Sequence, residues 1–146
     1  MTIIKDIRAF TADSSNKSTD YTSQPKGHWI TDTLVANPMA IYPEYRGSRT
    51  SWGIGVLGSV VVEVELENGV IGVGISTAGP PGCWLIEHHL KKFAIGQNVT
   101  NVELIWDQMW RASMPYGRKG ITIHAISAID LAIWDAMGKD AGKPVY

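Results

Sequence analysis

The stretch VVVEVELENGVIGVGIS, residues 60–76, specifies a pair of antiparallel strands from local sequence alone. Asn68-Gly69 is typical of a two-residue hairpin turn, because such turns need positive φ at both central residues. This turn pairs Glu67 with Val70 and keeps the apolar residues of the two strands in register. One face is then predicted to bury Val62, Val64, Leu66, Ile71, Val73 and Ile75. A lone hairpin cannot cover that face, so helices must pack on it.

The segments on either side of the hairpin predict a further strand and a first helix. Residues 3–10 are typical of a strand that pairs beside the hairpin. The glycine- and proline-rich residues 78–82 break the sheet. Apolar residues spaced for one helical face then predict a helix over 84–95, with Gly96 as its stop.

Two more helices are expected in the last third of the chain. Thr100 and Glu103 have the spacing of a capping box, which predicts a helix that runs to about Met114. The strongest helical pattern covers 121–137, and Gly138 is expected to end it. The expected fold class is therefore α+β: a small antiparallel β-meander followed by a three-helix bundle, with the helices on one face of the sheet.

Composition indicates one globular domain and disfavours several classes of partner. The chain has 146 residues, 45% of them hydrophobic and 18% charged, which is enough for one core. A formal net charge of −1 provides no basic field, so neither nucleic acid nor a membrane surface is an expected partner. Cys83 is the single cysteine, and no export or membrane-spanning segment is recognisable. We therefore expect a cytoplasmic protein.

A long segment between the first strand and the hairpin, residues 11–54, is the expected ligand-binding region. It is turn-rich, yet it contains tryptophan, tyrosine and aliphatic residues that argue against plain disorder. His28 lies beside Trp29, and Arg49 lies near Trp52. A planar guanidinium and an imidazole suit a polar anionic ligand. The alternatives are a loop folded over its own domain and two side chains that merely decorate a surface.

Other candidate groups have simpler explanations. His88 and His89 are adjacent in a predicted helix, so they point about 100° apart and cannot chelate one ion. Cys83 has no recognisable partner base, which favours an inert, half-buried thiol. Asp130 and Asp135 lie on different faces of the last helix, so hydrogen bonds to helix ends or loops are expected of them. Residues 78–82 lack the ending of a phosphate-binding loop.

Several motifs resemble the amino-terminal capping domain of the enolase superfamily, in its mandelate racemase branch. The motifs are ELIWDQM at 103–109, YGRKG at 116–120, HAISAIDLAIWDAMGK at 124–139 and GKPVY at 142–146. A second set resembles the L-rhamnonate dehydratases, a family within that branch: HWI at 28–30, NPM at 37–39, SRTS at 48–51, GSVVVEVE at 58–65 and STAG at 76–79. Residues 11–24 match this family little.

The resemblance implies a capping domain over residues 1–146 and a hinge at 138–146 into a (β/α) barrel that this chain lacks. It implies a lyase that eliminates water from L-rhamnonate through an enediolate to give 2-keto-3-deoxy-L-rhamnonate, with Mg²⁺ as cofactor. In the family the catalytic base and metal ligands come from the barrel, so no catalytic or metal residue is expected here. His28 and Arg49 correspond to substrate-binding positions.

The same resemblance implies partners for the chain. These are its own barrel domain, a sugar-acid substrate and further copies in a homo-oligomer, while the fragment alone should be inactive. Two alternatives stay open: a dehydratase of another sugar acid, and a stand-alone, non-catalytic module that binds a protein partner through its tryptophan-rich loop.

Overall fold

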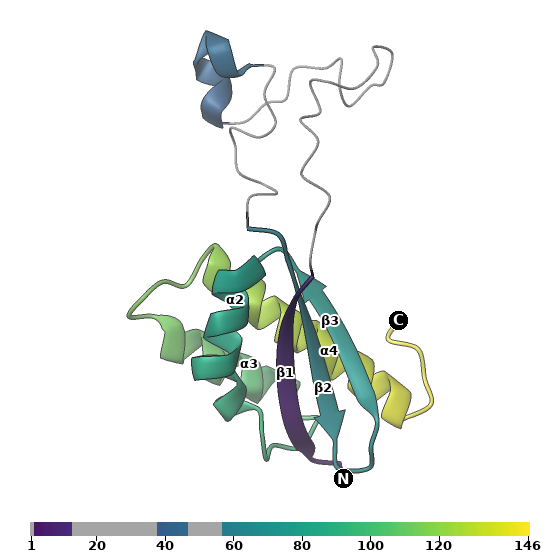
Figure 1. Ribbon diagram of the computed structural model, residues 1–146. Coiled ribbons are helices and arrows are strands. Elements are labelled where there is room, and N and C mark those ends of the chain that lie inside the picture. Colours follow the sequence, from purple (N-terminus) through teal and green to yellow (C-terminus); the bar gives the residue numbers. More distant parts are fainter. Residues whose placement is uncertain (1, 13–37, 47–56) are drawn as a thin grey trace, which may run out of the picture. The chain divides into compact units, whose positions relative to one another are not determined.

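The computed structural model describes residues 2–12, 38–46 and 57–146. The chain divides into two compact units, which are described separately: Met1–Asp13 with Gly58–Tyr146, and Ser14–Leu57. The first unit holds the sheet and the longer helices (Figure 1). In the second unit, the described residues form two short 3₁₀ turns, η2 (Pro38–Ile41) and η3 (Pro43–Tyr45).

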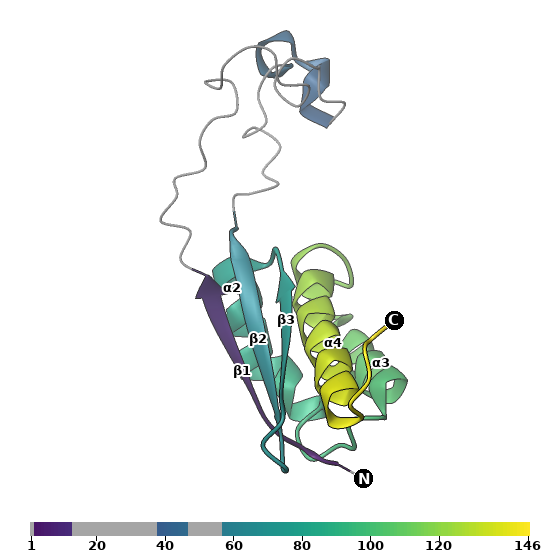
Figure 2. The ribbon, with the colours of Figure 1, turned by 90° about the vertical axis from the view of Figure 1, so that its right-hand side faces the viewer.

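The first unit is a β-meander covered by helices on one face, as the sequence predicted. Strands β1 (Ile4–Ala12), β2 (Ser59–Leu66) and β3 (Ile71–Ser76) form an antiparallel sheet in the order β1-β2-β3. Figure 2 shows all the helices of this unit on the same side of that sheet. The expected α+β class and the place of the first strand beside the hairpin are confirmed.

The helices follow in three groups. Helix α2 (Gly79–Leu85) continues into a π-helical turn, η5 (Ile86–Leu90), and a 3₁₀ turn, η6 (Lys91–Phe93). Helix α3 (Val102–Ser113) and helix α4 (Ile121–Asp140) complete the unit. By length and composition alone α4 could cross a membrane, but its apolar residues form the core of this fold, packed on β3 and β2.

The predicted register of the hairpin is wrong by one residue. Val62 pairs with Gly74 and Val64 with Gly72, whereas the prediction paired these valines with Ile75 and Val73. The connection has three residues, Glu67 to Gly69, and Leu66 is joined to Val70 by a hydrogen bond from its N–H to the Val70 carbonyl at 2.9 Å. Gly69 has φ +85°, the left-handed residue of this longer turn.

The shifted register reverses which residues of β3 are buried. The side chains of Val62, Val64 and Leu66 on β2 are fully buried, as expected, and so is that of Val60. On β3, however, Gly72 and Gly74 face the helices, while Ile71, Val73 and Ile75 lie on the open face, 39–59% exposed. The expectation that these three side chains belong to the core is wrong. Helix α4 lies so close to β3 that only glycine fits under it.

The core consists of buried aliphatic residues from the sheet, from η5, α3 and α4, and from the segments that connect them. Its fully buried large members are Ile4, Ile7, Leu66, Ile86, Leu90, Ile105, Met109, Ile126, Ile129, Ile133, Val60 and Val62. Alanines of α4 fill the remaining space against the sheet, which allows helix and strand backbones to approach closely.

Three helix boundaries differ from the expectations. The first helix begins at Gly79 and not at Trp84, because prolines fit the first turn of a helix, where their missing N–H needs no partner. Gly138 does not end α4: the helix continues to Asp140, and Gly142 with φ +61° follows it. The expected hinge over 138–146 therefore begins inside the last turn of α4.

The start of α3 is also different. Asn101 precedes the helix and makes no side-chain cap, so the capping box of Thr100 and Glu103 does not form. Instead, Asn98 Oδ1 accepts a hydrogen bond from the Thr100 N–H at 3.1 Å. The carbonyl of Asn101 accepts the first helical bond, from Ile105. The first helix was expected to stop at Gly96, but its last turn, η6, ends at Phe93 with Ala94 as the cap. Gly96 has φ +83°, and its N–H donates to the carbonyl of Ile4 at 2.9 Å.

Candidate functional site

The two predicted substrate-binding residues, His28 and Arg49, lie outside the described residues. Within their long segment the structure describes 38–46, where Tyr42 and Tyr45 meet edge to face at 6.3 Å between ring centroids. Arg46 Nε donates to the carbonyl of Ala40 at 3.2 Å, which ties η3 to η2. This part of the segment therefore has local structure of its own, with Ile41 71% exposed.

The sheet has one end at which the long segment leaves and returns, and we call it the loop-bearing end. Strand β1 ends at Ala12 and β2 begins at Ser59, and these two residues are paired. Ser76, at the end of β3, pairs with Val60 and so lies at the same end. This is therefore the end at which the long segment joins the sheet.

A polar cluster at the loop-bearing end was missed by the sequence reasoning. His124, in the first turn of α4, has its Nδ1 3.3 Å from both Ser76 Oγ and Thr77 Oγ1. Both of these side-chain contacts are exposed to solvent. The cluster offers two hydroxyls and an imidazole, groups that bind polyols or carboxylates. His124 is 48 residues from Ser76 and 47 from Thr77 in the sequence, so no local spacing indicates that these residues meet.

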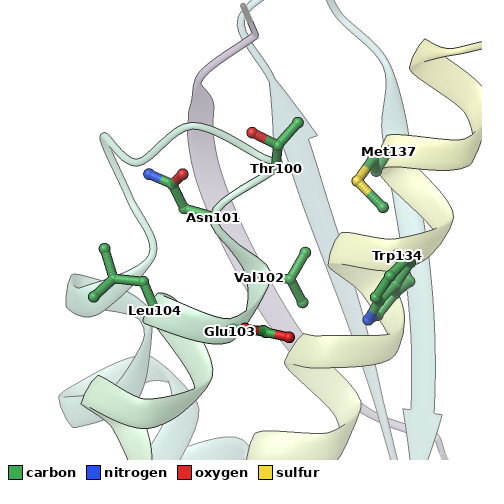
Figure 3. A pocket seen from close by; sticks show the side chains of 7 residues that line it. All are labelled: Thr100, Asn101, Val102, Glu103, Leu104, Trp134 and Met137. Carbon is green, nitrogen blue, oxygen red and sulfur yellow. The ribbon is translucent and has the colours of Figure 1, made fainter.

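A groove between α3 and α4 lies toward the other end of the sheet. The first turn of α4, with His124, lies at the loop-bearing end. Its last residue, Asp140, lies at the hairpin turn, where Asp140 Oδ1 accepts a hydrogen bond from Asn68 Nδ2 at 2.5 Å. Figure 3 shows the side chains that line the groove, a hollow of about 470 Å³. The lining residues are Thr100, Asn101, Val102, Glu103, Leu104, Trp134 and Met137.

A second hollow of about 200 Å³ adjoins this groove and shares Val102, Glu103 and Trp134 with it. Trp106 and Asp130 complete its lining. Burial raises the pKa of the Asp130 carboxyl above its ordinary value. Taken together, the groove and the second hollow are lined by two indole rings and two carboxyl groups, an acidic lining that is unfavourable for an anionic ligand such as a sugar acid.

The histidine pair and the cysteine have separate, structural surroundings. His88 stacks on Trp84 with ring centroids 4.6 Å apart, whereas His89 Nδ1 is 2.7 Å from the Tyr116 hydroxyl. Partial burial, together with nearby Lys92, lowers the pKa of His89. Cys83 Sγ donates to the carbonyl of Ala9 at 3.1 Å, and partial burial raises the pKa of this thiol. A raised thiol pKa opposes nucleophilic chemistry, as the sequence interpretation held.

Within residues 2–12, 38–46 and 57–146, no group of three or more His, Cys, Asp or Glu side chains could hold a metal ion. Asp130 and Asp135 are not brought together. Asp135 instead bonds the sheet, where its Oδ2 accepts from the Val73 N–H at 2.7 Å.

Curated relatives and solved structures resemble the chain over nearly all of its length. An L-rhamnonate dehydratase of Saccharopolyspora erythraea is 53% identical over 143 residues, covering 98% of this chain. A protein of Caldivirga maquilingensis, named as a candidate L-rhamnonate dehydratase, is 54% identical over the same number of residues. The chain spans only 36% and 35% of their respective lengths.

The crystal structure of rhamnonate dehydratase from Gibberella zeae complexed with Mg has 45% identity and a TM-score of 0.85. The match covers 100% of this chain and 36% of the Gibberella zeae enzyme's chain. The model of the mandelate racemase / muconate lactonizing enzyme N-terminal domain matches residues 35–146, more than half of the chain. The chain therefore belongs to the family of mandelate racemase / muconate lactonizing enzyme N-terminal domains.

Proposed function

We propose that this chain is the amino-terminal capping part of a longer, Mg²⁺-dependent hydro-lyase that removes water from L-rhamnonate. The observation that carries the proposal is 53% identity, across 98% of the chain, to a curated L-rhamnonate dehydratase. The 45% identity to the Gibberella zeae enzyme, at a TM-score of 0.85, supports it. A cytoplasmic location and assembly into a homo-oligomer belong to the same proposal.

The proposed reaction abstracts the proton next to the substrate carboxylate and passes through an enediolate to 2-keto-3-deoxy-L-rhamnonate. A Mg²⁺ ion supplies charge stabilisation for such an intermediate. The described residues of this chain do not fit that ion, because they form no cluster of three possible ligands. The proposal therefore assigns the metal ligands and the base to a barrel domain that follows this chain, and gives the chain no catalytic step.

The role left for the chain is to cover the site and hold the substrate. The long segment begins and ends at the loop-bearing end of the sheet, beside the cluster of Ser76, Thr77 and His124. We assign Arg49 to the substrate's carboxylate or hydroxyl oxygens and His28 to a hydroxyl group. A covering segment of this kind excludes water and determines which sugar acid is accepted.

The test compares the full-length protein with the 146-residue chain in a dehydration assay with L-rhamnonate and Mg²⁺. The full-length protein is expected to turn over L-rhamnonate faster than other six-carbon sugar acids, and the chain alone is expected to be inactive. Conversion by the chain alone would contradict the capping role. Faster turnover of a different sugar acid would contradict the assignment of L-rhamnonate as the substrate. A full-length protein that is inactive on every sugar acid would favour the non-catalytic module.

The assignment of the two loop residues is tested in the same full-length protein. Arg49→Met and His28→Asn are each expected to lower kcat/KM for L-rhamnonate roughly 10- to 1,000-fold, the cost of a lost buried polar contact. Arg46→Met is the matched control, because its Nε bonds within its own loop; kcat/KM should stay within about threefold. Mg²⁺ affinity should be unchanged in all three variants. Unaltered kcat/KM in both test variants would show that neither residue contacts the substrate.

A further inference from the structure

Strand β3 is an edge strand whose own residues give it no protection against pairing with another chain. It reads IGVGIS and carries no charge or proline, the devices that usually keep an edge from adding a further strand. Its large side chains, Ile71, Val73 and Ile75, lie on the open face. Leu66 and Val70 form a hydrogen-bonded pair, and bonded pairs alternate along an antiparallel ladder, so residues 72, 74 and 76 bond to β2. The backbone groups of Ile71, Val73 and Ile75 therefore point away from β2.

Helix α4 occupies this edge with two charged side chains. Asp135 Oδ2 accepts a hydrogen bond from the Val73 N–H at 2.7 Å. Lys139 Nζ donates to the Ile71 carbonyl at 3.0 Å and to Asp135 Oδ2 at 2.6 Å. The pair therefore uses one donor and one acceptor that a neighbouring strand would need. Partial burial would raise the pKa of Asp135, but the bonds from Lys139 and Val73 outweigh it and keep the pKa low, so the carboxylate is charged near neutral pH.

The opposite edge of the sheet has the same arrangement. The Ala9 N–H on β1 donates to Glu87 Oε1 at 2.6 Å, and Lys91 Nζ lies 3.5 Å from the Ile7 carbonyl. Glu87 and Lys91 pair with each other at 2.5 Å. On both edges an acidic residue accepts from a strand N–H. The lysine four residues after the acidic residue, Lys139 or Lys91, donates to a strand carbonyl. That carbonyl belongs to the residue two positions before the one whose N–H bonds the acid.

A third pair with this spacing shows that the arrangement is not a general property of these helices. Asp107 and Arg111 on α3 are joined at 2.7 Å and are exposed. Neither has a recorded bond to a strand in the part of the chain that the structure describes. Exposed pairs of this kind contribute little to the stability of a helix. The other two pairs, Asp135 with Lys139 and Glu87 with Lys91, differ from it because they contact the two edge strands, β3 and β1.

We propose that Asp135 with Lys139, and Glu87 with Lys91, are edge clasps that prevent a second copy of this chain from adding a strand to the sheet. The β3 clasp matters more, because β3 is uncharged and apolar, whereas β1 carries Lys5 and Arg8 on its open face. Without its clasp, β3 of one copy is expected to pair antiparallel with β3 of another. The open apolar face would then extend across both copies.

The experiment measures self-association of the 146-residue chain by sedimentation velocity over a range of concentrations. Asp135→Ala with Lys139→Ala should strengthen self-association at least tenfold relative to the parent chain. The matched control is Asp107→Ala with Arg111→Ala, which removes an i, i+4 pair but leaves both edges closed, and it should sediment as the parent does. Glu87→Ala with Lys91→Ala should give a smaller increase than the β3 variant. A monomeric β3 variant, or a control that associates equally, would overturn the proposal.

A rescue variant separates edge pairing from aggregation of a weakened fold. Val73→Lys, added to the β3 variant, places a cation on the open face near the centre of the edge strand. In an antiparallel pair of β3 strands these lysines come close to each other, and like charges there are destabilising. The rescued chain should return to the sedimentation of the parent although it has not regained its clasp. If it still associates, the association arises from lost stability and the edge clasp is disproved.

Discussion

Strands β2 and β3 are neighbours in one sheet and face the same helices, yet they bury opposite kinds of residue. On β2 the inward positions hold Val60, Val62, Val64 and Leu66, all fully buried. On β3 they hold Gly72 and Gly74, and the aliphatic residues point outward. Both strands alternate with period 2. The difference teaches that the alternation defines two faces but does not say which of them is buried.

The helix packed on β3 explains the difference. A Cβ at Gly72 would lie 2.1 Å from the carbonyl oxygen of Ala132, and one at Gly74 would lie 2.1 Å from that of Ala128. Both oxygens belong to the backbone of α4, which therefore contacts β3 directly. On β2, by contrast, buried valine and leucine side chains lie between the strand and the helices. Glycine is thus the residue that the close packing of α4 requires.

Gly74→Ala should have the largest effect among the variants that probe this comparison. The added Cβ would meet the Ala128 oxygen at 2.1 Å and the Ala132 nitrogen at 2.6 Å, and neither backbone atom can rotate away. Moving α4 off the sheet should cost about 3 kcal/mol of the free energy of unfolding, at the upper end of the usual range for overpacking. Urea unfolding measures this loss. A loss below about 1 kcal/mol would mean that α4 does not rest on β3.

The fold class was predictable because its signals are local. The alternation in β2 and the apolar period of α4 each act within one element. The register of β3 was not predictable in this way. Asn68-Gly69 fits a two-residue turn and also a three-residue turn with Gly69 in the left-handed region, and the choice depends on α4, which begins some fifty residues later.

In the candidate site, too, residue type and family resemblance could be used, whereas contacts that depend on helix packing could not be predicted. His28 and Arg49 were singled out by residue type and family resemblance, and both lie outside the described residues. The cluster of Ser76, Thr77 and His124 was not found, because only the packing of α4 on the end of β3 brings these residues together. Asp135 was expected to bond a helix end or a loop. Its hydrogen-bond partner is the Val73 N–H on the edge strand β3, a contact that depends on the same packing of α4.

Gly69→Val should have an intermediate effect, and it separates backbone strain from steric overlap. Gly69 has φ +85°, but no heavy atom lies within 4 Å of a Cβ placed there. The cost is therefore the left-handed conformation alone, about 1 to 2 kcal/mol for a β-branched residue. Gly69→Asn is the control, because asparagine tolerates this region and should cost clearly less. Equal losses for valine and asparagine would show that strain at this turn is not the cause.

Ile75→Thr should have the smallest effect and decides most directly between the two registers. In the observed register Ile75 is on the open face, 59% exposed, and pairs with Val61. Threonine keeps the β-branched shape that favours strands, so the free energy of unfolding should change by no more than about 0.5 kcal/mol. In the two-residue-turn register the same side chain would belong to the core, and burying a hydroxyl there without a partner would cost about 1–3 kcal/mol. Urea unfolding distinguishes these values, and a loss in the second range would restore the register that the Asn-Gly turn alone predicts.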